Sequence, residues 1–165
     1  MKSNFLIISI ISFFLHTNLL CENLNIESKN ISIDKNSKLS IFKDSVVVKD
    51  NDNNTLETEY AEYSKDDQLL KTVGKTNILT SEGFFLEGED VLFNNKKKVI
   101  SSGSNAIITD LEKNKIYLEN FEYSTKNNFF KSIGKIKVSD ANKNNYNFTQ
   151  VYIDEKKREI IGTDV

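Results

Sequence analysis

The stretch that decides the fold is residues 46–75, which reads VVVKDNDNNTLETEYAEYSKDDQLLKTVGK. It recurs in phase, without insertion or deletion, at 76–105, 106–135 and 136–165, and residues 26–45 supply part of a further unit. Apolar positions repeat every 30 residues, as in Val48, Ile78, Ile108 and Val138. A fixed period of this length is typical of stacked repeat proteins, in which each recurring side chain becomes a continuous stripe.

Each unit is predicted to be a bent pair of strands with a short return strand. Residues 46–50 open the first unit as a strand, residues 136–140 alternate apolar and polar side chains, and the Asp that ends each begins a turn. In the third unit the apolar positions change parity between Leu118 and Phe121. A flat strand cannot change faces in this way, so we expect a bulge or a corner there. The predicted fold class is all-β, a stack of antiparallel bent strands.

Composition excludes several classes of function. The chain has 165 residues and a net charge of -2, which gives no case for a nucleic-acid partner. The single Cys and the single His are Cys21 and His16, so the chain beyond residue 21 has no thiol and no imidazole. Thiolate or imidazole catalysis, zinc binding through these residues and a disulfide framework are therefore excluded there. We expect no enzyme activity, no cofactor and no metal site.

The first 22 residues are predicted to be a signal peptide. Lys2 supplies a positive start, and residues 5–15 form an apolar run of the length of a secretory core. This run is shorter than the ~20 apolar residues of a membrane span. We expect export with cleavage near Cys21 or Asn23. Acylation at Cys21 and a retained anchor are the alternatives.

The repeat also carries a recognisable pattern. It opens with Val46-x-Val48-x-Asp50, continues with Leu56, Glu59, Ala61 and Tyr63, and closes with Leu70 and Gly74. Across residues 26–165 this pattern resembles the OstA-like repeat of the lipopolysaccharide-transport proteins. The resemblance implies an open β-jelly roll, or β-taco, which is a V-shaped pair of sheets with an apolar interior. It also implies a periplasmic location and edge-to-edge stacking with other OstA-like proteins. Lipopolysaccharide would be carried with its lipid A acyl chains in the trough.

Within that family, residues 152–163 look most like the periplasmic front domain of the LptD proteins, in which an outer-membrane barrel follows. Alternatives are an LptA-like free bridge subunit and an LptC-like anchored subunit. The chain stops where a new copy of the repeat would begin. We therefore expect either a partner that adds at this edge or a longer protein of which this is the front part.

The resemblance assigns the groove lining to inward-facing positions of the repeat. Those positions are Val46, Val48, Leu56, Ile78, Leu86, Ala106, Ile108, Ile116, Leu118, Ile136, Val138 and Tyr146. The set that contains Val48 is expected on one wall, and the set that contains Leu56 on the opposite wall. A closed sandwich core would show the same alternation, so a structural β-solenoid without a ligand is the alternative of a different class.

Overall fold

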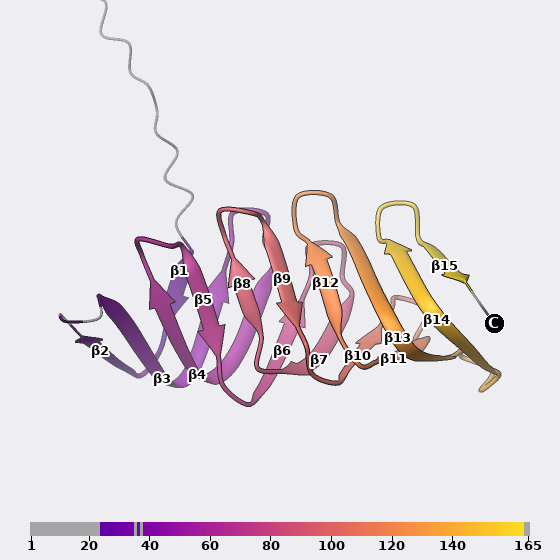
Figure 1. Ribbon diagram of the computed structural model, residues 1–165, viewed down its shortest axis with the longest axis horizontal. Coiled ribbons are helices and arrows are strands. Elements are labelled where there is room, and N and C mark those ends of the chain that lie inside the picture. The colour runs from indigo at the N-terminus through magenta and orange to yellow at the C-terminus, as the bar shows by residue number, and fades with distance from the viewer. Residues whose placement is uncertain (1–23, 35, 37, 164–165) are drawn as a thin grey trace, which may run out of the picture.

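The protein is all-β, as predicted. The computed structural model describes residues 24–34, 36 and 38–163, and every regular element within them is a strand. All strand pairs are antiparallel, and the strands belong to one hydrogen-bonded sheet (Figure 1). Within these residues no helix is long and apolar enough to cross a membrane. The predicted signal peptide, residues 1–22, lies outside the described part of the chain.

Fifteen strands follow one another along the described residues. They are β1 (Asn25–Glu27), β2 (Asn30–Asp34), β3 (Leu39–Lys49), β4 (Thr55–Ser64), β5 (Leu69–Thr72), β6 (Lys75–Leu79), β7 (Phe85–Glu89), β8 (Leu92–Asn94), β9 (Val99–Ser102), β10 (Ala106–Thr109), β11 (Lys115–Leu118), β12 (Phe121–Ser124), β13 (Phe129–Ser139), β14 (Asn145–Asp154) and β15 (Glu159–Thr163).

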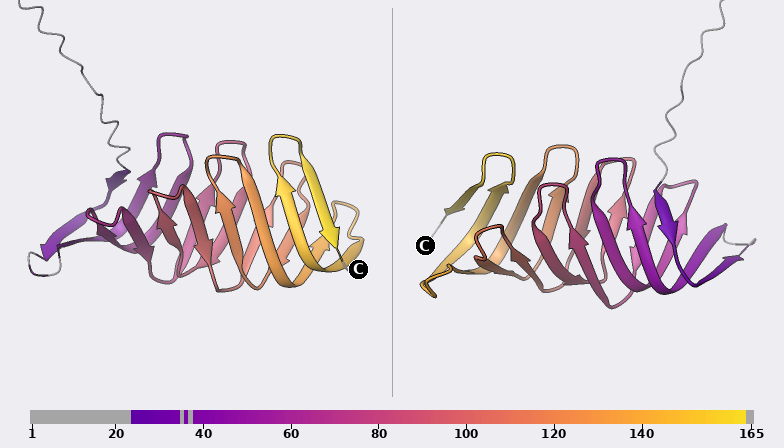
Figure 2. Two further views of the ribbon diagram at one scale, coloured as in Figure 1. Left: turned by 45° about the horizontal axis from the view of Figure 1, so that its top comes forward. Right: turned by 180° about the vertical axis from the view of Figure 1, so that it is seen from behind.

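The sheet is folded into two layers. Strands β5, β8, β9 and β12 lie in the front layer of Figure 1, and β6, β7, β10 and β11 lie in the rear layer. The long strands β3, β4, β13 and β14 bend and contribute one half to each layer. The first half of β4, for example, pairs with β6, and its second half pairs with β5. The strands stand side by side along the long axis of the molecule, so each unit stacks on the one before it (Figure 2).

The bends occur where the sequence changes parity. Strand β11 ends at Leu118 and β12 begins at Phe121, which confirms the predicted corner. Strand β13 crosses a similar point without ending, but its register against β14 shifts between Ile133 and Ile136. The buried positions of β13, Phe130 to Val138, keep one parity, and the shift lets β14 change parity between Phe148 and Val151, so the apolar side chains of both strands stay inside across the bend.

Buried hydroxyl groups hold the bends. Thr72, Ser102 and Ser132 recur every 30 residues and are 3–6% exposed. Ser102 Oγ donates to the Glu89 carbonyl at 2.6 Å, and Ser132 Oγ donates to the Asn120 carbonyl at 2.7 Å. Thr72 Oγ1 accepts from the Val91 amide at 2.9 Å. These bonds pair backbone groups that the broken ladder leaves without a strand partner.

The turns at the other edge of the stack, which we call the rim, also repeat. In the rear layer, Asp50 Oδ1 accepts from the Asn54 amide at 2.8 Å and its Oδ2 accepts from Asn54 Nδ2 at 2.8 Å. Asp110 with Asn114 and Asp140 with Asn144 repeat this arrangement. The expectation that these aspartates form turns is therefore confirmed, and the second unit differs in having Thr80.

Candidate functional site

One row of apolar side chains runs the length of the rear layer, across successive strands. The strand register joins Val48 to Leu56, Leu56 to Ile78, Ile78 to Leu86, Leu86 to Ile108, Ile108 to Ile116, Ile116 to Val138 and Val138 to Tyr146. Paired residues in an antiparallel sheet point to the same face. The 30-residue period therefore does build a continuous apolar stripe.

The opposite wall is formed by residues that were not predicted to line the site. In the front layer the register joins Tyr63, Leu70, Phe93, Ile100, Tyr123, Phe130, Ile153 and Ile160 into a second row. We expected the Leu56 set to face the Val48 set, and this was wrong. The turn at residues 50–54 makes the two strands direct hairpin neighbours, so both sets lie in one layer.

The predicted lining residues are mostly buried between the two layers. Eleven of the twelve, from Val46 to Val138, are at most 8% exposed and belong to one hydrophobic cluster. The exception is Tyr146, which is 45% exposed. Its strand segment, the first part of β14, pairs only with β13 among the described residues, so no neighbouring strand covers the ring. In this conformation the rear-layer row and the front-layer row pack against each other, which shields both from solvent.

Hydrogen bonds join the two layers across the rim. Tyr123 Oη in the front layer lies 2.8 Å from Glu155 Oε2 and 3.3 Å from Asn54 Oδ1 of a rear-layer turn. Thr80 Oγ1, also in the rear layer, donates to Glu155 Oε1 at 2.8 Å. We call Asn54, Thr80, Tyr123 and Glu155 the rim clasp. Beside it, Asn128 Nδ2 of the front layer donates to Glu82 Oε1 of the rear layer at 2.7 Å.

The rim clasp is an unusual place for a carboxyl group. Glu155 is 2% exposed. Its burial raises the pKa of the carboxyl to about 7, against the lowering effect of the Thr80 and Tyr123 hydroxyls. Burial and the nearby Glu155 also raise the pKa of Tyr123. The sequence contains one signal for this cluster, because Thr80 stands where the other three units have Asp.

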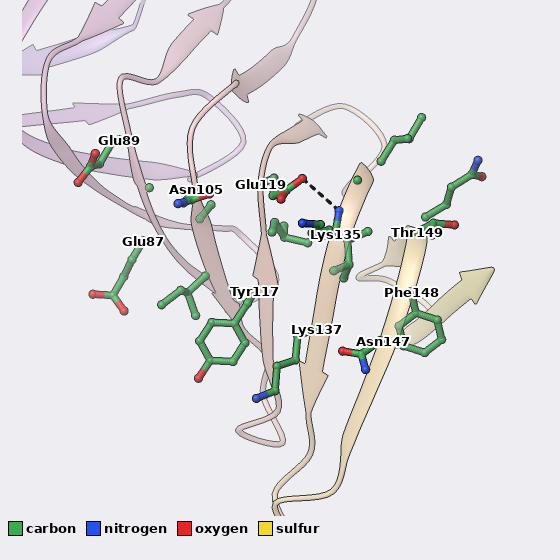
Figure 3. A pocket seen from close by; sticks show the side chains of 18 of the residues that line it. Glu87, Glu89, Asn105, Tyr117, Glu119, Lys135, Lys137, Asn147, Phe148 and Thr149 are labelled. Atoms are coloured by element: carbon green, nitrogen blue, oxygen red, sulfur yellow. Dashed lines mark hydrogen bonds between the residues drawn. The ribbon is translucent and has the colours of Figure 1, made fainter. Parts of the chain in front are cut away.

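Two of the hollows lined by described residues lie beside the packed interior. The smaller, of about 230 Å³, lies at the rim and is lined by Phe84, Ile160, Leu111 and Arg158 together with Asp110, Glu112 and Asn114. The larger, of about 1080 Å³, lies over the rear layer (Figure 3). Its size is comparable to that of ligand pockets, which are roughly 300–1,000 Å³.

The larger hollow combines outward-facing charges with a few interior residues. Lys75, Lys135 and Lys137 and the carboxylates of Glu87, Glu89 and Glu119 line it, so its charges balance. Lys75 Nζ lies 3.2 Å from Glu87 Oε1, and the Lys135 amide donates to Glu119 Oε2 at 3.2 Å. Tyr117 and Ile133 are partly exposed on the same surface. Three predicted lining residues, Ala106, Leu118 and Ile136, also contribute to it.

No protein-family model matches the sequence, and no curated protein matches it either. The chain is similar to a solved structure described as LptH, the LptA homologous periplasmic component of the conserved lipopolysaccharide transport device from Pseudomonas aeruginosa. The two share 12% sequence identity, and the alignment covers 87% of this chain and 84% of that chain with a TM-score of 0.32.

Proposed function

We propose that this chain shields the acyl chains of lipopolysaccharide in its apolar interior, as one span of a periplasmic bridge to the outer membrane. The observation that supports this is the unbroken rear-layer row from Val48 to Tyr146, with a second apolar row in the front layer. The choice of lipopolysaccharide as the ligand of this row rests on the OstA-like pattern of the sequence.

The free-energy cost of exposing an acyl chain to water favours a continuous apolar row over an isolated pocket as the binding site. Exposing one methylene to water costs about 0.8 kcal/mol, so a twelve-carbon acyl chain needs roughly 10 kcal/mol of shielding. A continuous apolar lining provides this at every point along the chain, which allows the lipid to move. An acyl chain that enters replaces apolar contacts between the layers with apolar contacts to itself. Loading therefore requires the two layers to part and leaves little apolar surface uncovered.

The partners we propose are lipopolysaccharide and other OstA-like proteins that add at a sheet edge. Within the described residues the first part of β14 pairs only with β13, and β15 pairs only with β14. Such edges present unpaired backbone groups that another strand can complete. The finer proposal is an LptD front domain, with LptA-like and LptC-like subunits as alternatives. Reading the gene downstream of Val165 tests this, since barrel-coding sequence there would identify LptD.

A second candidate function is a structural stack that binds no lipid. The observations that favour it are the burial of the predicted lining residues and the hydrogen bonds across the rim. In this alternative the apolar rows serve only as a core. The two candidates differ in whether lipid reaches the interior face of the sheet.

A fluorescence titration tests the proposal, because the chain contains no Trp. Tyr146→Trp places a single indole on the interior row at its exposed end, and Tyr117→Trp places one on the outer face beside the larger hollow. Both tyrosines are partly exposed, at 45% and 37%, so both variants should fold. We expect lipopolysaccharide to shift the emission of the Tyr146→Trp variant to shorter wavelength and to leave the Tyr117→Trp variant unchanged.

The opposite pattern would place the lipid in the outer hollow and contradict the interior site. A titration in which neither variant responds would favour the structural stack.

A further inference from the structure

The rim clasp connects all four repeat units through one buried network. Asp50 and Asn54 belong to the first unit, Thr80 to the second, Tyr123 to the third and Glu155 to the fourth. Asn54 Oδ1 also accepts from the Ser81 amide at 3.0 Å, and Thr80 Oγ1 accepts from the Phe84 amide at 3.1 Å. The clasp therefore ties the rear-layer turns of the first two units to the front layer of the last two.

A count of protons shows which form of Glu155 completes the clasp. Asn54 Oδ1, Tyr123 Oη and Glu155 Oε2 form two successive contacts between three oxygen atoms. Tyr123 carries one hydrogen and can donate to only one of its two neighbours. If Glu155 is protonated, it donates to Tyr123 Oη, and Tyr123 donates to Asn54 Oδ1. If Glu155 is ionised, only the Tyr123 hydrogen is available, so one of the two oxygen–oxygen contacts has no hydrogen atom between its oxygens and is not a hydrogen bond.

The second unit is adapted to the carboxyl group. The equivalents of Thr80 are Asp50, Asp110 and Asp140, and the equivalents of Glu155 are Lys65, Asn95 and Thr125. An Asp at position 80 would set a carboxylate against Glu155 in a buried place, which is costly. Thr80 instead donates a hydrogen bond to Glu155 while it still accepts from the turn amide. The one departure from Asp in this series therefore contacts the buried carboxyl group directly.

We propose that the rim clasp is a proton-controlled gate, which closes the interior when Glu155 is protonated and releases the rim when Glu155 is ionised. This rests on the proposed function, since the gate would control when acyl chains reach the interior rows. The physical basis of the gate is that an ionised Glu155 would be a buried charge whose only hydrogen-bond donors in the clasp are neutral hydroxyl groups. Opening the rim returns that charge to water.

The charged surroundings reinforce this direction. Glu82, in the turn after Thr80, raises the pKa of Glu155, and Asp50 lies close enough to raise the pKa of Tyr123. The cations on the turn of Glu155 are Lys156, Lys157 and Arg158, all of them exposed. Lys157 is paired with Asp154 at 3.4 Å. Among the described residues, none of these cations forms an ion pair with the Glu155 carboxylate.

The test measures uptake of the uncharged apolar dye N-phenyl-1-naphthylamine by the full chain as pH is varied. With a pKa of about 7, the ionised fraction of Glu155 rises roughly tenfold between about pH 6 and pH 8. We expect dye fluorescence to rise several-fold over this range. In Glu155→Gln the amide copies the protonated form, so uptake should stay low at both pH values. Glu159→Gln, an exposed neighbour with the same charge change, should behave like the unaltered protein.

A crosslink provides a second measurement that does not depend on Glu155. Asn128 Nδ2 and Ser81 Oγ lie 3.5 Å apart across the rim. Ser81→Cys with Asn128→Cys, in a Cys21→Ser background and joined by a short bismaleimide, should hold the rim shut and abolish the pH-dependent uptake. Dye uptake that does not change with pH in the unaltered protein would contradict the gate. So would a pH-dependent uptake that is as large in Glu155→Gln or in the crosslinked form as in the unaltered protein. The lipid response of Tyr146→Trp at fixed pH would be unaffected by that outcome.

Discussion

Glu155 is the residue whose charge state matters most to the folded protein. It is almost fully buried, and its two oxygen atoms contact hydroxyl groups from two other units. Burial penalises the ionised form and raises the pKa of Glu155 to about 7, so the carboxyl group keeps its proton below that pH. At the residue scale, therefore, the closed rim depends on a proton that most carboxyl groups have lost at neutral pH.

The first prediction concerns the free energy of unfolding as a function of pH. The pKa of Glu155 is about 7 in the folded state against an ordinary 4.5, so the folded protein holds a proton that the unfolded chain loses first. The stability that Glu155 contributes is fully present below about pH 4.5 and falls as pH rises through about 7. Urea unfolding should show a lower midpoint at about pH 8 than at about pH 5.5.

Glu155→Gln should remove most of that difference, and Glu159→Gln should keep it. Asp140 and Asp154 have pKa values lowered from 3.8 by hydrogen bonds, so they titrate below this window. A midpoint that is the same at both pH values in the unaltered protein would contradict the assignment.

The second prediction concerns backbone strain in the turns. The equivalent turn positions Asn53, Gly83, Lys113 and Lys143 all have positive φ, and Lys143 has φ of 66°. This conformation costs a non-glycine residue about 1–2 kcal/mol. Lys143 is exposed, so Lys143→Gly should raise the free energy of unfolding by about 1 kcal/mol in urea titrations.

Lys137→Gly makes the same chemical change within strand β13 and serves as the control. There the substitution should lower stability by roughly 0.5–1 kcal/mol. Equal effects at positions 143 and 137 would show that the turn is not strained.

At the scale of the element, the bends are as specific as the strands. At the three bends near positions 72, 102 and 132 the backbone ladder is interrupted, and a buried hydroxyl from the repeat bonds a backbone group there. Ser102→Ala should cost about 1–3 kcal/mol in urea unfolding, because it leaves the Glu89 carbonyl without this donor. Ser101→Ala is the matched control, since Ser101 is the adjacent residue and points to the other face of β9. If both variants lose equal stability, the hydroxyl at 102 does not hold the bend.

Sequence reasoning predicted the elements well for a simple physical reason. Period-2 alternation defines a strand and its buried face, and the parity change between Leu118 and Phe121 defines a corner. It misassigned the walls, because alternation says which side chains point inward and not which layer they belong to. The hairpin turn after Val48 was the clue, since strands joined by so short a turn must pair with each other.

The rim clasp was beyond that reasoning for a different reason. Thr80 and Glu155 are 75 residues apart, and their contact depends on how the two layers are offset along the stack. The repeat pattern describes neighbours within one layer and carries no information on that offset. Tyr146 lies in the predicted row but is 45% exposed, because its burial requires a further strand beside β14.

At the scale of the whole molecule, the stack places two apolar rows face to face along its long axis (Figure 2). The rows are in contact in the closed form, and the rim is held by polar groups that can exchange their partners for water. This combination suits a container that opens along one edge. A purely structural core would gain nothing from a buried carboxyl that weakens the rim at neutral pH.

The most direct test of the lipid-shielding interior is photocrosslinking to labelled lipopolysaccharide from a photoreactive residue at Ile78 or Ile108, which are at most 1% exposed in the interior row. Lys75, on the outer face beside Glu87, is the control position. We expect adducts from positions 78 and 108 and none from position 75. Adducts confined to position 75, with none from the two interior positions, would contradict it.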